Sequence, residues 1–130
     1  MLSPMQFVFE DSEVAQLQLR EKVLTVHFSA ARVVEGARTG SGEGHWMRLL
    51  LICELDALSD TGLHASGRLE GGCVRVGGQT LRSLPLSYEV QQPFVLELDF
   101  ASGHQVRLQG HKLQLRTPEG AGAVESFQCG

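Results

Sequence analysis

The chain has 130 residues, of which 42% are hydrophobic and 20% are charged, and its formal net charge is −4. This length and composition are typical of one domain with an apolar core, and they exclude disorder as the main state. The mild negative charge excludes the strongly basic balance that is typical of nucleic-acid-binding proteins. We therefore expect a single β domain over residues 1–130 and no nucleic-acid partner.

Several features of the sequence predict a cytoplasmic protein without a membrane partner. Residues 1–13 contain neither a basic segment nor an apolar run of signal-peptide length. The longest apolar run, from Leu49 to Cys53, is far too short to span a membrane. The three cysteines are odd in number and have no paired spacing, which argues against a disulfide framework.

The hydrophobic pattern predicts strands along the whole chain. Apolar residues recur at every second position in segments 24–30, 47–55, 94–100, 106–108 and 113–115, and this period is typical of a strand buried on one face. No credible long helix interrupts these segments. The pattern therefore predicts an all-β fold, an antiparallel meander of about eight to ten strands that forms a small barrel or sandwich.

The first predicted element is a hairpin that turns at Glu21 and Lys22. Its expected cross-strand pairs are Leu19 with Leu24 and Leu17 with Val26. These turn residues are not the favoured ones for a tight hairpin. A helix over residues 12–23 is therefore the alternative.

The next two predicted strands, residues 23–34 and 46–57, pair across a glycine-rich loop at 36–45. The expected register matches Phe28 with Leu51 and Val26 with Cys53. The second of these strands carries apolar residues on both faces, so we expect it to be central in the sheet and covered in part on both sides. Its inward row runs from Met47 to Leu55 and anchors the core.

Two further hairpins follow in the second half of the chain. One turns at Gly77-Gly78, which suits positive φ at both positions, and the other joins residues 94–100 to 104–109 with Gly103 as the left-handed residue of its loop. The expected pairs are Val74–Leu81 and Arg75–Thr80 in the first hairpin, and Leu96–Leu108, Glu97–Arg107 and Leu98–Val106 in the second.

The alternation changes phase at Gly110, because the inward residues before it are even-numbered and those after it are odd-numbered. One inserted residue, in a β-bulge or tight corner at Gly110-His111, explains this change. The Gly71-Gly72 pair is a second candidate for such a point. Residues 118–130 are expected to be a loop-like tail.

No arrangement typical of catalysis, metal binding or cofactor binding is present in the sequence. The glycine-rich loop lacks the lysine and the following helix of a phosphate-binding loop. Cysteine and histidine pairs with zinc-site spacing are missing, and His104 and His111, seven residues apart, are the nearest approach to one. His27 and Ser29 share a strand face, a common and uninformative pattern. We therefore expect no cofactor, no metal and no catalytic residue.

The preferred functional hypothesis is a non-catalytic interaction or assembly module that binds a second copy of itself or another protein. Its expected interface residues are Trp46, Leu50 and Ile52, on the second face of the central strand. Loop or tail residues of the same chain are the alternative cover for these side chains.

A small-ligand-binding β-barrel is the rival hypothesis, with its mouth at Arg38, His45 and Trp46. A barrel this small is usually filled by side chains, which counts against that rival. An enzyme without a recognisable motif is the third and least favoured hypothesis.

Overall fold

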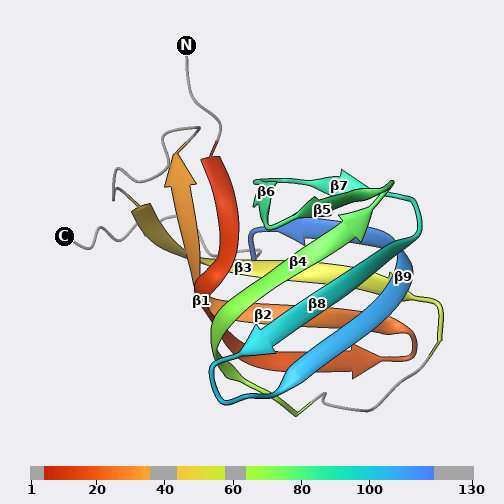
Figure 1. Cartoon of the computed structure of the whole chain (residues 1–130), viewed down its shortest axis with the longest axis horizontal. Coiled ribbons are helices and arrows are strands. Elements are labelled where there is room, and N and C mark those ends of the chain that lie inside the picture. The colour runs from red at the N-terminus through yellow and green to blue at the C-terminus, as the bar shows by residue number, and fades with distance from the viewer. Residues whose placement is uncertain (1–4, 36–43, 58–63, 119–130) are drawn as a thin grey trace.

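The computed structural model describes residues 5–35, 44–57 and 64–118, and these form nine strands (Figure 1). The strands are β1 (Met5–Arg20), β2 (Val23–Glu35), β3 (Gly44–Leu55), β4 (Gly67–Val76), β5 (Gln79–Leu81), β6 (Ser83–Pro85), β7 (Glu89–Val90), β8 (Phe94–Phe100) and β9 (Gln105–Arg116). Every pairing between them is antiparallel. The predicted all-β antiparallel fold is therefore confirmed.

Six of the strands form a closed ring in the order β1–β2–β3–β9–β8–β4. The ring closes where β4 pairs with β1, through Glu13 opposite Arg68 and Val14 opposite Gly67. The short strands β5, β6 and β7 add to β4, β1 and β9. Among these six strands, those that follow one another in the sequence also pair in the ring, except β3 and β4, which are separated by β9 and β8. The described residues include no helix long and apolar enough to cross a membrane.

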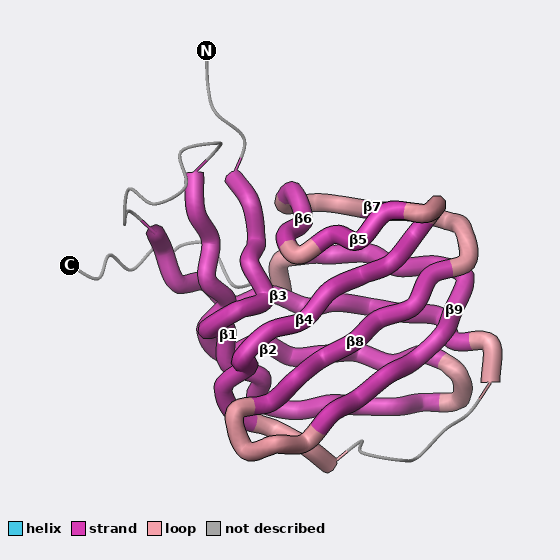
Figure 2. The backbone as a smooth tube through the Cα atoms, in the orientation of Figure 1, coloured by secondary structure: helices cyan, strands magenta, loops and turns pink. Residues whose placement is uncertain are grey.

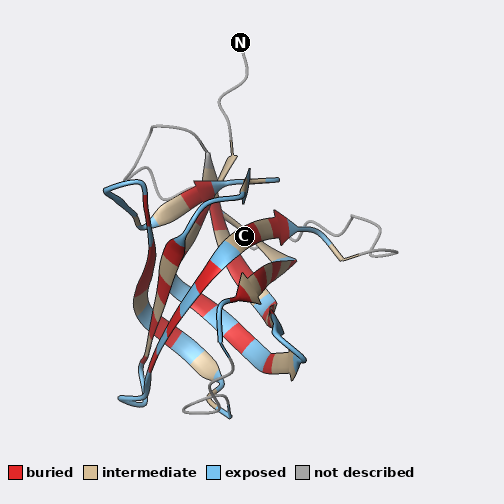
Figure 3. Cartoon of the chain, turned by 90° about the vertical axis from the view of Figure 1, so that its right-hand side faces the viewer, coloured by how far each residue is buried: buried red, intermediate tan, exposed pale blue. Residues whose placement is uncertain are grey.

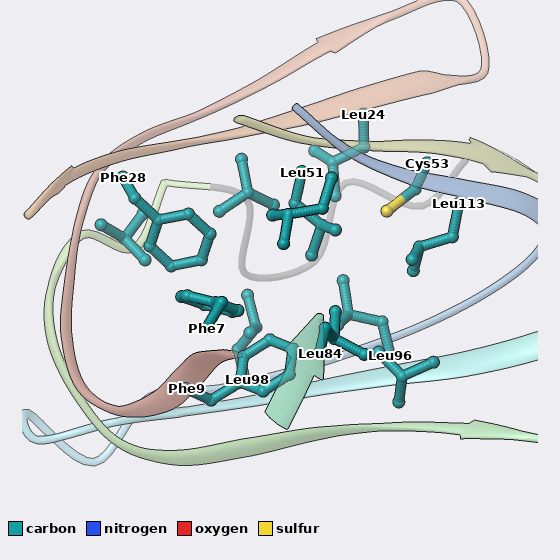
Figure 4. Close-up of a cluster of buried hydrophobic side chains, with 14 of the residues drawn as sticks. Phe7, Phe9, Leu24, Phe28, Leu51, Cys53, Leu84, Leu96, Leu98 and Leu113 are labelled. Atoms are coloured by element: carbon teal, nitrogen blue, oxygen red, sulfur yellow. The ribbon is translucent and has the colours of Figure 1, made fainter. Parts of the chain in front are cut away.

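The interior of the ring is filled by apolar side chains. Figure 3 shows buried and exposed residues alternating along the strands, as the period of two predicts. The centroid of the Phe7 aromatic ring lies 4.9 Å from that of Phe28 and 4.8 Å from that of Phe9. Figure 4 shows core side chains from the two sides of the barrel facing one another, with Phe28 and Leu51 on one side and Leu98 and Leu96 on the other.

The three predicted hairpins are confirmed with their predicted registers. Leu19 lies opposite Leu24, Val74 opposite Leu81, and Leu98 opposite Val106, together with the other expected pairs. Gly77, Gly78 and Gly103 all adopt positive φ. The alternative helix over residues 12–23 is wrong, because β1, a turn and the start of β2 occupy this segment. Glu21 adopts the left-handed conformation in the turn, although it is not one of the residues that favour that conformation.

The predicted register between β2 and β3 is wrong by two residues. Phe28 lies opposite Leu49 and Val26 opposite Leu51, where the sequence predicted Leu51 and Cys53. A shift of two residues leaves every side chain on the same face of its strand. The hydrophobic pattern therefore identifies the paired strands and their inward faces but does not distinguish these two alignments.

Both predicted irregularities, at Gly110-His111 and at Gly71-Gly72, are confirmed. Between Glu54 and Leu55 the partner on β9 changes from Lys112 to Gly110, so His111 is the inserted residue. The register of β4 on β8 shifts in the same way between Leu69 and Gly71. Each bulge exchanges the inward and outward positions that follow it.

A further irregularity bends β1 between Val8 and Glu13. Ser12, the one buried polar residue among those described, satisfies the backbone at this bend. Its hydroxyl donates to the carbonyl of Val8 at 2.7 Å and accepts from the amide of Arg32 at 2.8 Å. Asp11, in the left-handed conformation, reaches Arg68 of β4 at 3.2 Å. The bend lets the two halves of β1 pair with β6 and β4 in turn.

The bulge at Gly110 leaves no room for a side chain, which generates the first testable prediction. A Cβ atom at Gly110 would lie 2.8 Å from the Phe94 ring and closer still to the carbonyl oxygen of Glu54. Because the Glu54 carbonyl cannot retreat without opening the β3–β9 pairing, Gly110→Ala should lower the free energy of unfolding in urea by about 3 kcal/mol.

Gly71→Ala is the matched control. A Cβ atom at Gly71, beside the other bulge, would meet nothing within 4 Å. This variant should stay within about 0.5 kcal/mol of the parent. Equal losses in the two variants would contradict the packing described for Gly110.

Candidate functional site

Strand β3 carries all three predicted interface residues on its outer face. Its odd-numbered residues from Leu49 to Leu55 are buried in the barrel, so Trp46, Leu50 and Ile52 point outward. All three side chains are half-buried. The structure therefore places these residues on the strand face that the sequence predicted, and their role in an interface stays a prediction.

Leu50 and Ile52 lie between two flanking strands. Their directly opposite residues are His27 and Arg116 for Leu50, and Thr25 and Gln114 for Ile52. The neighbouring Val23 is 37% exposed and is the one exposed large apolar residue among those described. An apolar patch of this size is ordinary for a monomer and does not by itself indicate a binding surface.

The first half of β3 is different, because it has a strand on one side only among the described residues. Residues 44–47 and Leu49 have partners on β2, but pairing with β9 begins at Leu50, opposite Arg116. We call the other side of residues 44–49 the open edge of β3. Figure 2 shows this half of β3 projecting beyond the barrel with the adjoining ends of β1 and β2. Unpaired amide and carbonyl groups at such an edge are available to another strand.

The predicted ligand mouth is not assembled by the described residues. Arg38 lies outside them, as do residues 36–43 of the glycine-rich loop and residues 119–130 of the predicted tail. His45 and Trp46 lie side by side on β3, opposite Val33 and Arg32, and consecutive residues of a strand point to opposite faces. These two side chains therefore do not converge on one entrance.

Sequence reasoning missed a polar cluster on the outer face of β4 and β8. Glu97 contacts Arg75 at 3.5 Å and Arg107 at 3.4 Å, and only the second pair was predicted. The thiol of Cys73 also donates to Glu97, with Sγ 3.6 Å from Oε1. The bulge at Gly71 sets which residues of β4 face outward, so its position was the available signal. Of this cluster, Cys73, Arg75 and Glu97 line a polar hollow that also includes Arg82 and Asp99.

The environment of Cys73 does not activate its thiol. Burial is the main cause that raises the pKa of Cys73, and the neighbouring Glu97 carboxylate adds to it, while Arg75 and Arg82 oppose the shift. A raised pKa lowers the thiolate fraction at neutral pH, and the thiolate is the reactive form. The cluster is therefore an ion-pair network that disfavours the thiolate form of Cys73.

A second polar cluster surrounds the bulged residue His111. Its Nδ1 lies 3.0 Å from Asp56, and its Nε2 lies 3.6 Å from Glu54, which also contacts Lys112 at 3.9 Å. Each ring nitrogen thus faces a different carboxylate, so the three groups do not converge on one point. No group of three metal-ligating side chains occurs in the parts of the chain described. His104 lies before β9, about 20 Å along the strand from His111.

Among the residues that the structure describes, no acid contacts the His27 and Ser29 pair. The Nε2 atom of His27 lies 3.0 Å from the amide oxygen of Gln18 on the outer face of β1. Ser29 is exposed at the bulge that follows in β2. A histidine held by a neutral amide lacks the orienting carboxylate of a catalytic triad. The pair therefore gives no support to the enzyme hypothesis.

Comparison with known proteins gives no relative: no family model, no curated protein and no solved structure matches the chain.

Burial in the barrel raises the pKa of the Cys53 thiol from 9.0 to about 12. The folded protein therefore favours the neutral thiol, and this stabilisation is complete below pH 9 and is lost as the pH rises toward 12. Between pH 8 and pH 10 the free energy of unfolding should therefore fall in the parent by about 1.4 kcal/mol more than it falls in Cys53→Ala. Urea unfolding of both proteins at the two pH values measures this difference. Parallel losses would mean that Cys53 is not buried as described.

Proposed function

We propose that this domain is a non-catalytic protein-interaction module that binds a strand of its partner at the open edge of β3. The observation that carries the proposal is the length of this edge, six residues from Gly44 to Leu49 without a second strand among the described residues. Extended segments add to exposed sheet edges through main-chain hydrogen bonds, and alternate side chains then supply specificity.

The side chains at this edge favour binding over protection. Natural proteins usually protect a sheet edge with lysine, proline or very short strands. The open edge instead presents Trp46 and Met47, both half-buried, and its one full charge is Arg48. Aromatic residues, methionine and arginine are the residue types enriched at protein interfaces.

The barrel interior gives no support to the rival small-ligand function. Aromatic and aliphatic side chains from every strand of the ring meet at its centre. Two hollows among the described residues lie on the outer surface, one over β4 and β8 and the other over β1 and β2.

The two described cysteines are free. Free thiols fit the cytoplasmic location that we propose for this module.

Photo-crosslinking in cells tests the proposal even though the partner is unidentified. A benzoylphenylalanine at position 46 keeps an aromatic side chain at the open edge, and the same residue at Gln109, an exposed position on β9, is the control. Position 46 should give a crosslinked product of defined mass and position 109 should give none. Equal products from both positions, or none from position 46, would contradict the proposed surface.

A further inference from the structure

The open edge of β3 is complementary to itself. Trp46 and Arg48 lie two residues apart on the outer face, and Met47 lies between them on the inner face. Residues directly opposite in an antiparallel pair share a face. If two copies pair about a two-fold axis at Met47, Trp46 of each copy therefore lies opposite Arg48 of the other. This is the self-complementary arrangement that a symmetric dimer requires.

The two side chains suit such a contact. A guanidinium group stacks on the face of an indole ring and attracts it electrostatically. Arg48 is exposed and makes no ion pair with a described residue. Arg32, which lies opposite Trp46 on β2, is directed toward Asp11 at 4.0 Å. Arg48 of a second copy would therefore supply a cation on the side of Trp46 that faces away from β2.

The described residues that follow β9 do not extend its pairing along β3. The pairing ends with Arg116 opposite Leu50, and Thr117 and Pro118 belong to no strand. In a continued register Pro118 would lie opposite Arg48, and proline cannot donate a ladder hydrogen bond.

We propose that a second copy of this chain occupies the open edge, in an antiparallel pairing centred on Met47 that joins two barrels through a continuous sheet. The proposal rests on the proposed function and names its partner and register. The paired segment runs from residue 45 to residue 49 of each copy. Because so short a contact is at the small end of specific interfaces, the dimer is a reversible one that forms as the concentration rises.

Sedimentation velocity of the full chain, in the presence of a reductant, tests the partner. The parent should shift from monomer to dimer across the micromolar range. Arg48→Glu replaces the cation opposite Trp46 by an anion and should weaken the dimer at least tenfold. Arg20→Glu makes the same charge change at an exposed residue at the far end of β1 and should leave the association unchanged. Equal dissociation constants for all three proteins would overturn the proposal.

Disulfide trapping tests the register. With Cys129 replaced by serine, Met47→Cys chains should form a covalent dimer on mild oxidation, because residue 47 faces its own copy across the axis. A mixture of Trp46→Cys and Arg48→Cys chains should form the mixed dimer, and it leaves Met47 in place. A dimer trapped through Trp46→Cys alone would overturn the register.

These outcomes separate this inference from the proposed function. A chain that stays monomeric while position 46 crosslinks to a different protein would overturn the second copy as partner and leave the interaction module intact. A monomer without any crosslink would overturn both. A dimer in solution with cysteine traps at the predicted positions supports both.

Discussion

Backbone hydrogen bonding around the ring is the constraint on which the rest of this structure depends. Every strand in a sheet has two edges, and an unpaired edge leaves amide and carbonyl groups without protein partners. Closure of β4 on β1 removes most edges here, and the bend at Ser12 makes that closure compatible with the length of β1. The pairing ends unevenly at β3, because β9 reaches only as far as Leu50. The open edge of β3 is thus a consequence of how the barrel closes.

Much of this fold follows from local sequence signals. Alternating hydrophobicity identified the strands and their inward faces, and the turn glycines at residues 77, 78 and 103 fixed two registers because a tight turn leaves few alignments. The phase change at Gly110 located the bulge, because one inserted residue exchanges the parity of the inward positions. Sequence could not distinguish two alignments of β2 and β3 that keep the same inward residues, since the loop between these strands sets no register.

The candidate site was predicted in part, and the rest depends on contacts between distant segments. Trp46, Leu50 and Ile52 were assigned to the outer face from their parity alone. Leu50 and Ile52 have two flanking strands, whereas Trp46 has one among the described residues. This difference depends on where β9 ends along β3. The cluster of Cys73, Glu97 and Arg75 was missed because it requires the alignment of β4 on β8 across a bulge. The hydrophobic period of one sequence does not determine how distant strands align, so it cannot predict contacts that depend on that alignment.

Residue-resolved amide hydrogen exchange measures the open edge directly. In dilute protein, the amides of residues 44–49 that point away from β2 should exchange far faster than those of residues 50–55, which lie between β2 and β9. Raising the protein concentration should slow the first set and leave the second unchanged. Equally slow exchange of both sets at every concentration would mean that the chain covers this edge itself, and it would contradict an edge that is free to pair with a second strand.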